Sequence, residues 1–236
     1  MARLKPDEMV DLHTHSFLSD GELLPEELVR RVEVAGYRML VLSDHVGFSN
    51  AGDVIPQAVR LARSLRGKCP VRVLLGAEVT HVRPELIARA VALARRSGAA
   101  LVLGHGQTIS EPVLDGTNRA YILAGVDVLA HPGLIDLADA RLAAERGVAL
   151  EISGRRGHSY TNGHVLHVAR RTGAHLVYGS DGHGVSDYPT RRDAERVAFG
   201  AGMTPDEVDA MFAHAEALFE AAWRKGVLRP REDSSS

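Results

Sequence analysis

The sequence predicts an α/β fold in which seven parallel strands close into a distorted (β/α)7 barrel of the TIM-like type. Seven short runs rich in Val, Leu, Ile and Ala alternate with helix-like segments along the 236 residues, an alternation typical of parallel sheets. Six of these runs end in histidine, aspartate or glutamate. An open sheet focuses its site between two strands, whereas a barrel brings every strand end to one mouth. Side chains from six strand ends can therefore meet only if the sheet closes.

The predicted strands are nearly continuous apolar runs, as expected for strands that helices cover. They are 10–15, 39–45, 71–78, 100–105, 126–131, 147–153 and 175–183. The predicted helices are 25–35, 57–66, 84–97, 118–124, 139–146, 163–172, 191–201 and 205–224. Thr204 and Glu207 are spaced as a capping box that begins the last helix. Left-handed C-caps are expected at glycines that follow helices, namely Gly36, Gly98, Gly125, Gly147 and Gly173.

Length and composition indicate one domain over residues 1–236, because no linker or change in composition divides the chain. We expect an ordered core over residues 10–224 and a disordered tail at 232–236. The net charge of −2 gives no global attraction to nucleic acid or membranes. The single cysteine, Cys69, excludes an intramolecular disulfide and a thiolate zinc cluster. With no apolar run long enough for a signal peptide or a membrane span, we expect a cytoplasmic protein without a membrane partner.

Nine side chains of metal-binding type lie at or just after the strand ends, and they favour a multi-metal active site. His13 and His15 are two residues apart in the first run, so both imidazoles share one face of a strand. Asp181 and His183 repeat this spacing with a carboxylate. The complete set of predicted metal ligands is His13, His15, Asp20, His45, Glu78, His105, His131, Asp181 and His183.

A buried cluster of imidazoles and carboxylates is unfavourable unless a partner or a cation neutralises it. A purely hydrogen-bonded network would need donors for Glu78, Asp181 and Asp20, and lysines are scarce in this sequence. The metal interpretation is therefore favoured over the polar network. Several imidazoles with carboxylates suit Zn, Mn or Fe better than Mg or Ca. Because His131 precedes a proline, we also expect extended backbone there.

The chain resembles the PHP (polymerase and histidinol phosphatase) family, and most closely its small standalone phosphatases with three metals. The resemblance extends from residue 10 to about residue 199. It is carried, in order and with family-like spacing, by DLHTH, SDGELLPEEL, LSDH, GAE, GH, AHPG and GSDGH. It implies a distorted (β/α)7 barrel that holds two or three divalent metal ions.

The resemblance also implies how the ligands divide among the metals. One metal would take His13, His15, Glu78 and Asp181. A second would take Glu78, His105 and His131, with Glu78 as the bridge, and a third would take His45, His183 and Asp20. For Asp20 an ordinary turn role within Ser-Asp-Gly stays open.

The loop at 154–162 follows the sixth predicted strand and carries Arg155, Arg156 and His158. Arginine forks match phosphate oxygens, although a polar loop is often simply solvated. We hypothesise a histidinol-phosphatase-like hydrolase of a small phosphate monoester, in which a metal-bridged hydroxide attacks phosphorus. Glu78 and Asp181 would hold the metals, and His158 or Asp44 would donate a proton to the leaving alcohol. Arg155 and Arg156 would bind the phosphate.

Two other functions stay open. The first is a phosphodiesterase or nuclease acting on nucleotides or short oligonucleotides. Against it, aromatic residues make up only 5% of the chain, and stacking on aromatics is a usual way to bind single strands. Nucleic acid is therefore not the expected partner; a small phosphorylated substrate is. The second is a non-catalytic, metal-stabilised module. The sequence indicates nothing about the oligomeric state.

Overall fold

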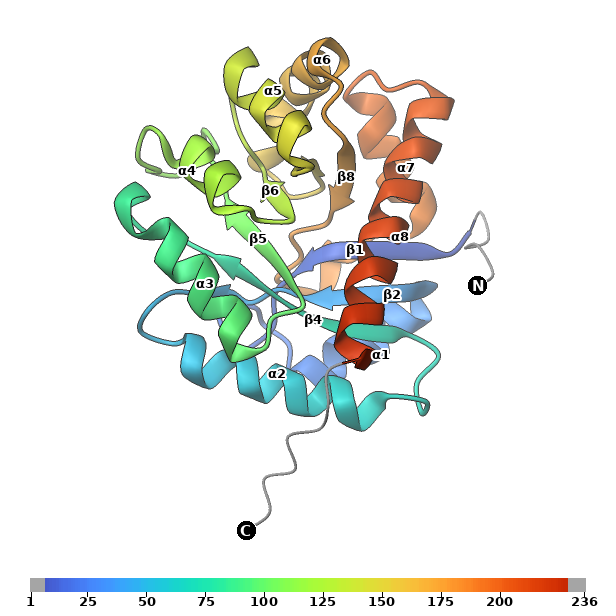
Figure 1. The fold of residues 1–236 in the computed structure, drawn as a ribbon. Coiled ribbons are helices and arrows are strands. Elements are labelled where there is room, and N and C mark those ends of the chain that lie inside the picture. The colour runs from blue at the N-terminus through green and yellow to red at the C-terminus, as the bar shows by residue number, and fades with distance from the viewer. Residues whose placement is uncertain (1–6, 229–236) are drawn as a thin grey trace.

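The structure is a computed structural model, and it describes residues 7–228. The predicted tail at 232–236 lies outside the described residues. Seven parallel strands pair in the order β1-β2-β4-β5-β6-β7-β8, and the two-residue strand β3 pairs with β4. Helices surround this sheet (Figure 1). The predicted distorted, TIM-like barrel is confirmed.

The predicted strands all form, with boundaries within a few residues of those expected. They are β1 (Met9–Thr14), β2 (Tyr37–Leu42), β3 (His45–Val46), β4 (Arg72–Val79), β5 (Leu101–His105), β6 (Val128–Ala130), β7 (Ala149–Ser153) and β8 (Leu176–Gly179). The α-helices are α1 (Pro25–Val34), α2 (Ala51–Leu65), α3 (Ile87–Ser97), α4 (Thr117–Ala124), α5 (Leu137–Arg146), α6 (Asn162–Thr172), α7 (Arg191–Gly200) and α8 (Pro205–Leu228).

Helix ends follow the predicted capping signals closely. Thr204 and Glu207 form the expected capping box: the Thr204 amide donates to the Glu207 carboxylate at 2.7 Å, and the reciprocal bond is 3.4 Å. All five predicted C-terminal glycines have positive φ. Helix α2 departs from its predicted start at residue 57: it begins at Ala51, so that Pro56 lies inside the helix. The Asn50 side chain, which bonds the backbone of Gly47 and His45, holds the segment before that helix.

The barrel closes where β1 meets the chain that follows β8. The Asp181 amide donates to the His13 carbonyl at 2.9 Å, and the His15 amide donates to the Gly182 carbonyl at 2.9 Å. Thr14 and Gly182 form a parallel bridge between the same segments. Backbone hydrogen bonds therefore place the first predicted ligands in the sequence, His13 and His15, beside the last ones, Asp181 and His183.

Helix α8 packs on the starts of the strands, at the end of the barrel opposite the strand-end ligands. Arg72, the first residue of β4, forms an ion pair with Glu220 at 2.6 Å and lies over the ring of Trp223. His175, just before β8, has its ring 3.7 Å from that of His214. This end is thus covered, which leaves the carboxyl ends of the strands as the place for a site.

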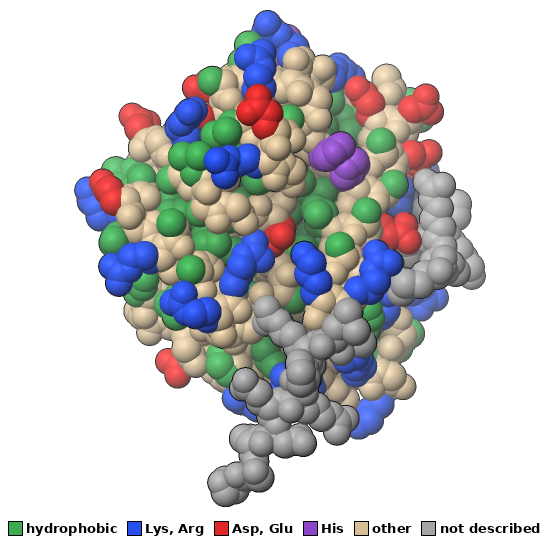
Figure 2. All heavy atoms as spheres, in the orientation of Figure 1, with side chains coloured by type: hydrophobic (Ala, Val, Ile, Leu, Met, Phe, Trp, Pro, Cys, Tyr) green, Lys and Arg blue, Asp and Glu red, His purple; other side chains and the backbone are tan. Residues whose placement is uncertain are grey.

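The outer surface is charged. Figure 2 shows Lys and Arg side chains interspersed with Asp and Glu over one face of the molecule. Among the helices of the described residues, none has the length and apolar character that crossing a bilayer requires.

A close contact between β5 and α4 gives a test of the packing. The Tyr121 ring lies so close to Gly104 that a Cβ there would overlap it, and Tyr121 is fully buried, with its hydroxyl donating to the Val79 carbonyl. We expect Gly104→Ala to lower the free energy of unfolding by about 1–3 kcal/mol through overpacking. Urea denaturation measures this change. Gly52→Ala, at an exposed position of α2 with open space around it, is the matched control and should be neutral or slightly stabilising. Equal effects of the two substitutions would contradict the packing argument.

Candidate metal centre

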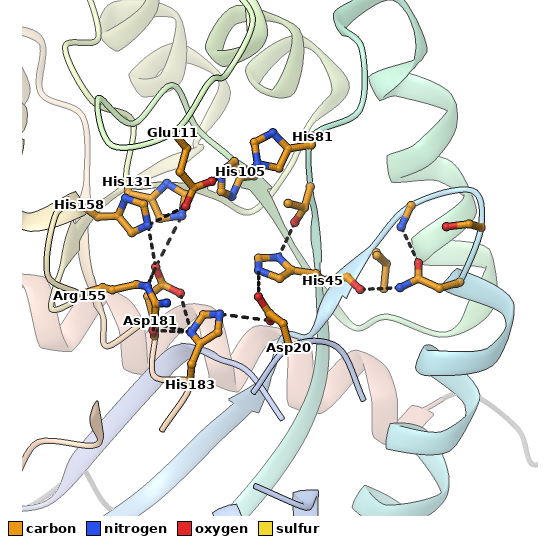
Figure 3. A pocket seen from close by; sticks show the side chains of 15 residues that line it. Asp20, His45, His81, His105, Glu111, His131, Arg155, His158, Asp181 and His183 are labelled. Carbon is orange, nitrogen blue, oxygen red and sulfur yellow. Dashed lines mark hydrogen bonds and ion pairs between the residues drawn. The ribbon is translucent and has the colours of Figure 1, made fainter. Parts of the chain in front are cut away.

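The carboxyl ends of the strands bring all nine predicted ligands to one rim. His13 is the residue before the last of β1 and His15 lies just beyond that strand, Glu78 lies near the end of β4, and His105 is the last residue of β5. His131 follows β6 directly, and Asp181 and His183 follow β8. Asp20 comes from the loop before α1, and His45 from β3. Figure 3 shows six of the nine around a cavity that they line, namely Asp20, His45, His105, His131, Asp181 and His183.

Glu78 lies at the centre of the cluster and is fully buried. Its two oxygens lie between 2.8 and 3.7 Å from ring nitrogens of five histidines. These are His13, His15, His45, His105 and His131. Burial raises the pKa of the carboxyl, but the charges of the surrounding imidazoles outweigh it and hold the pKa well below its usual value. Glu78 is therefore an anion that imidazoles surround.

Asp181 is the second buried carboxylate of the cluster. Its Oδ1 lies 3.2 Å from His15 Nε2 and 3.6 Å from His13 Nε2, and its Oδ2 lies 3.8 Å from His131 Nε2. As for Glu78, burial opposes ionisation, but the neighbouring histidines lower the pKa of Asp181. The two carboxylates thus share His13, His15 and His131 between them.

Asp20, His45 and His183 form a more exposed group above His15. The carboxylate of Asp20 lies 3.2 Å from His183 Nε2 and 3.5 Å from His45 Nε2, although the Asp20 side chain is 56% exposed. The rings of His15 and His183 are stacked at 4.1 Å. The structure therefore brings Asp20 to the other predicted ligands, which favours the ligand role over a simple turn role.

Unpaired buried nitrogens provide a test of whether this set suits cations. Among the described residues, His13 Nε2, both ring nitrogens of His15 and His131 Nδ1 are buried without a hydrogen-bond partner. Such groups are unfavourable, and carboxylates lie 3–4 Å from several of them. Divalent cations would satisfy both kinds of group. The donor set therefore fits metal ions, and its overlapping clusters support a multinuclear site.

Glu151 supports this cluster from below and was not predicted as a site residue. It is buried in the middle of β7, where its Oε2 lies 2.6 Å from His13 Nδ1 and its Oε1 accepts from the His131 amide at 3.3 Å. The absence of a side chain at Gly179 makes room for this carboxylate. A carboxylate that binds Nδ1–H leaves Nε2 free for a metal. The only sequence signal was a glutamate inside an apolar run, away from the strand end.

Glu111, in the loop between β5 and α4, was also missed. Its carboxylate lies 3.0 Å from His105 Nε2, 3.0 Å from His81 Nε2 and 3.4 Å from His158 Nε2. Nothing in the local sequence of this loop distinguishes Glu111 from a solvated residue, because the contact depends on where the loop folds back.

The predicted substrate-binding loop is only partly at the cavity. Arg155 lines it and donates to the Asp181 carbonyl at 3.0 Å. His158 also lines it, with its ring stacked on His131 at 4.2 Å and its Nε2 3.5 Å from the Asp181 carboxylate. Arg156, in contrast, is exposed and lies outside the residues that line this cavity.

Asp44, the other candidate proton donor, occupies a different setting. It is buried outside the cavity lining, and it accepts hydrogen bonds from the Ser16 amide at 2.7 Å and the Ser19 hydroxyl at 2.8 Å. Burial raises its pKa. These bonds tie the loop after β1 to the end of β2, which is a structural role.

The backbone is unusual at this site. Among the described residues, three that are not glycine have positive φ, namely His81, His131 and Asp181. Such conformations are costly and cluster at functional sites. The extended backbone expected at His131 is therefore wrong: φ is 28°. The chain turns directly after β6, while the Ala130 carbonyl accepts from the Gly106 amide.

The cavity above these residues has a volume of ≈ 370 Å³, at the lower end of the range for small-molecule sites. Its lining is polar and titratable, with imidazoles, carboxylates and one arginine. The arrangement can bind cations at its floor and a small anionic molecule above them.

Comparison with known proteins gives the same family as the sequence motifs. The sequence profile of the PHP domain matches residues 11–104. An uncharacterized protein of Methanocaldococcus jannaschii, MJ1295, is 39% identical over 206 residues, which are 86% of this chain and 94% of that protein.

Two solved structures share the fold. One is histidinol phosphate phosphatase from Lactococcus lactis, with a TM-score of 0.58 and 17% identity over 83% of this chain and 94% of that one. The other is a chain of archaeal ribonuclease P with mature tRNA, with a TM-score of 0.68 and 16% identity over 95% and 96%. At these identities they show the fold alone. The PHP profile, and a relative that aligns along most of this chain, show that the chain belongs to the PHP domain family.

Proposed function

We propose that this protein is a metal-dependent phosphoesterase that hydrolyses a small phosphate monoester. The observation that carries the proposal is the Glu78 cluster: two buried carboxylates, Glu78 and Asp181, surrounded by imidazoles, next to a cavity that Asp181 and Arg155 line. A hydrolase of phosphate esters needs both a way to activate water and positive charge around phosphate. The buried imidazoles and carboxylates would hold the cations that activate water. The cations and Arg155 would supply positive charge around the phosphate.

The implied metals would be held by the residues that lie together. Glu78, Asp181, His13 and His15 would form one set, Glu78, His105 and His131 a second, and His45, His183 and Asp20 a third. Two or three divalent ions of Zn, Mn or Fe suit these nitrogen and oxygen donors. When bound, such ions lower the pKa of water and neutralise phosphate charge.

The remaining roles belong to side chains at the cavity wall. The guanidinium of Arg155 would orient phosphate oxygens, as a fork-shaped donor can. His158 would donate a proton to the leaving oxygen. The proton would come from its imidazolium form, in which both ring nitrogens carry a proton. Nδ1–H would then donate to the Thr108 hydroxyl, 2.6 Å away, and Nε2–H, near Asp181, would be the proton that is transferred, which leaves a neutral imidazole.

Substrate size favours a small monoester. The cavity volume of ≈ 370 Å³ suits a compact phosphorylated molecule. Histidinol phosphate is the first candidate, because the sequence resembles the small phosphatases of this family. A phosphodiester remains the second candidate, since a chain of archaeal ribonuclease P has the same fold. Comparing hydrolysis of p-nitrophenyl phosphate with that of its bis-ester distinguishes the two.

Metal removal tests the central claim. We expect chelator-treated protein to lose hydrolysis of p-nitrophenyl phosphate, because the imidazoles and carboxylates alone cannot generate hydroxide at neutral pH. Adding back Zn, Mn or Fe separately should restore it, with metal content measured on the same sample. A panel of cellular phosphomonoesters that includes histidinol phosphate then identifies the substrate. Hydrolysis that survives complete metal removal would contradict the mechanism.

Glu78→Gln tests the central carboxylate. The amide keeps the shape but removes the negative charge that the five imidazoles surround, so we expect loss of bound metal and a fall in turnover of more than about 100-fold. Elemental analysis and steady-state kinetics measure the two effects. Glu85→Gln, at an exposed side chain, is the matched control. A Glu78→Gln protein with normal metal content and rate would refute the central role.

Glu151→Gln tests the support beneath His13. Because Glu151 orients His13 without lining the cavity, we expect metal affinity to fall by about 10- to 100-fold. Competition with a chelator of known affinity measures the change, and thermal unfolding of the metal-free protein separates it from lost stability. Glu145→Gln, on the exposed side of α5, is the control. Unchanged affinity would show that Glu151 has only a packing role.

A further inference from the structure

A group that joins His105 to two residues outside the nine predicted ligands also has the geometry of a metal site. Glu111 Oε2 lies 3.0 Å from His81 Nε2 and 3.0 Å from His105 Nε2. The rings of His81 and His105 are 4.6 Å apart, and the three donor atoms all lie within 4.8 Å of one another. Figure 3 shows the three side chains together at one wall of the cavity. We call this group the outer cluster.

The outer cluster is open to solvent on one side. The side chains of His81 and Glu111 are 45% and 35% exposed, whereas that of His105 is 3% exposed. His81 follows β4 and holds a φ of 50°, and Glu111 comes from the loop after β5. An ion could therefore reach this group from solvent without passing through the Glu78 cluster.

Its donors suit a borderline cation such as Zn²⁺. Two imidazoles and one glutamate are the protein ligands of a known type of open zinc site, in which water completes the coordination. Tetrahedral zinc with bonds of about 2.0–2.1 Å places its ligand atoms roughly 3.3 Å apart. The 3.0 Å separations therefore need to open by only a few tenths of an ångström. The recorded ion pairs of Glu111 are all with histidines, whose protons a metal can replace.

His105 links the outer cluster to the Glu78 cluster. Its Nδ1 lies 3.3 Å from Glu78 Oε1, while its Nε2 lies 3.0 Å from Glu111 Oε2 and is buried without a hydrogen-bond partner among the described residues. A neutral imidazole has one lone pair available, on one of its two nitrogens. His105 can therefore bind an ion at the Glu78 cluster or at the outer cluster, but not at both while it is neutral.

We propose that His81, Glu111 and His105 Nε2 form a peripheral divalent-cation site that competes with the Glu78 cluster for His105, so that excess metal inhibits the enzyme. This site binds a cation more weakly than the buried sites do, because it has three protein ligands and two of them are exposed. When metal is scarce the Glu78 cluster keeps His105, and only excess metal draws His105 to the outer cluster. The inhibitory part rests on the proposed phosphoesterase function, whereas the binding part does not.

Equilibrium dialysis of the metal-loaded protein against increasing free Zn²⁺ tests the binding. We expect the wild-type protein to take up one further equivalent at high free zinc, and His81→Asn to lack it while keeping the tighter equivalents. Asparagine is chosen because it tolerates positive φ. Glu111→Gln should lose the same equivalent. His167→Asn, at an exposed position of α6, controls for adventitious binding by surface histidines. Identical isotherms for wild-type and His81→Asn proteins, both folded by circular dichroism, would overturn the site.

Kinetics tests the competition. With p-nitrophenyl phosphate, we expect the wild-type rate to fall at high free zinc by about 5- to 150-fold, the usual range of coupling between sites. The relative rate of His81→Asn should stay level over the same range. A further equivalent without inhibition would overturn the competition for His105. If the protein hydrolyses no phosphoester, dialysis still decides the site, so failure of the proposed function is distinguishable from failure of this inference.

Discussion

The pairing of a buried carboxylate, Glu78, with five imidazoles is the constraint on which the rest of the site depends. An isolated carboxylate at this depth would be strongly unfavourable. Its partners come from β1, β3, β5 and the end of β6, so they converge only when the sheet curves into a barrel. Closure of the barrel at Thr14 and Gly182 then adds Asp181 beside them. Fold and site are therefore one arrangement: the same closure that completes the sheet concentrates the negative charge and the nitrogen donors that cations would balance.

A second layer of polar residues keeps these donors in place. Glu151 binds His13 from within β7, and the Thr80 hydroxyl lies 2.6 Å from His45 Nδ1. Asp11 accepts from the amides of His13 and Ser180 at 3.1 Å, which ties β1 to β8, and burial raises its pKa to about 6. Ligands that are held this way need little reorganisation when an ion binds. The left-handed backbone at His131 and Asp181 is tolerated because this layer and the neighbouring strands hold both residues on either side.

A barrel of this kind supports many chemistries, so its function depends on the residues of its site and not on the fold. The residues fall into three groups by their position around the cavity. Glu78 is buried beneath the lining, Arg155 and His158 form one wall, and the outer cluster forms another. His105 contacts both Glu78 and Glu111, through different nitrogens. One imidazole thus couples the metals proposed for catalysis to a peripheral site that responds to the supply of metal.

The sequence alone was sufficient for the parallel barrel and for the nine candidate ligands that the structure brings together, because hydrophobic runs and the residues that follow them are local patterns. The alternation of side chains along a strand predicts which residues share one face, and parallel pairing places the carboxyl ends of all the strands at one rim. Tertiary structure alone decided the contacts of Glu151, Glu111 and His81, and separated Arg155 at the cavity from the exposed Arg156. The contacts of these residues depend on where a loop folds back or on what lies under a neighbouring strand. Such contacts join positions far apart in the chain, and no local periodicity encodes them.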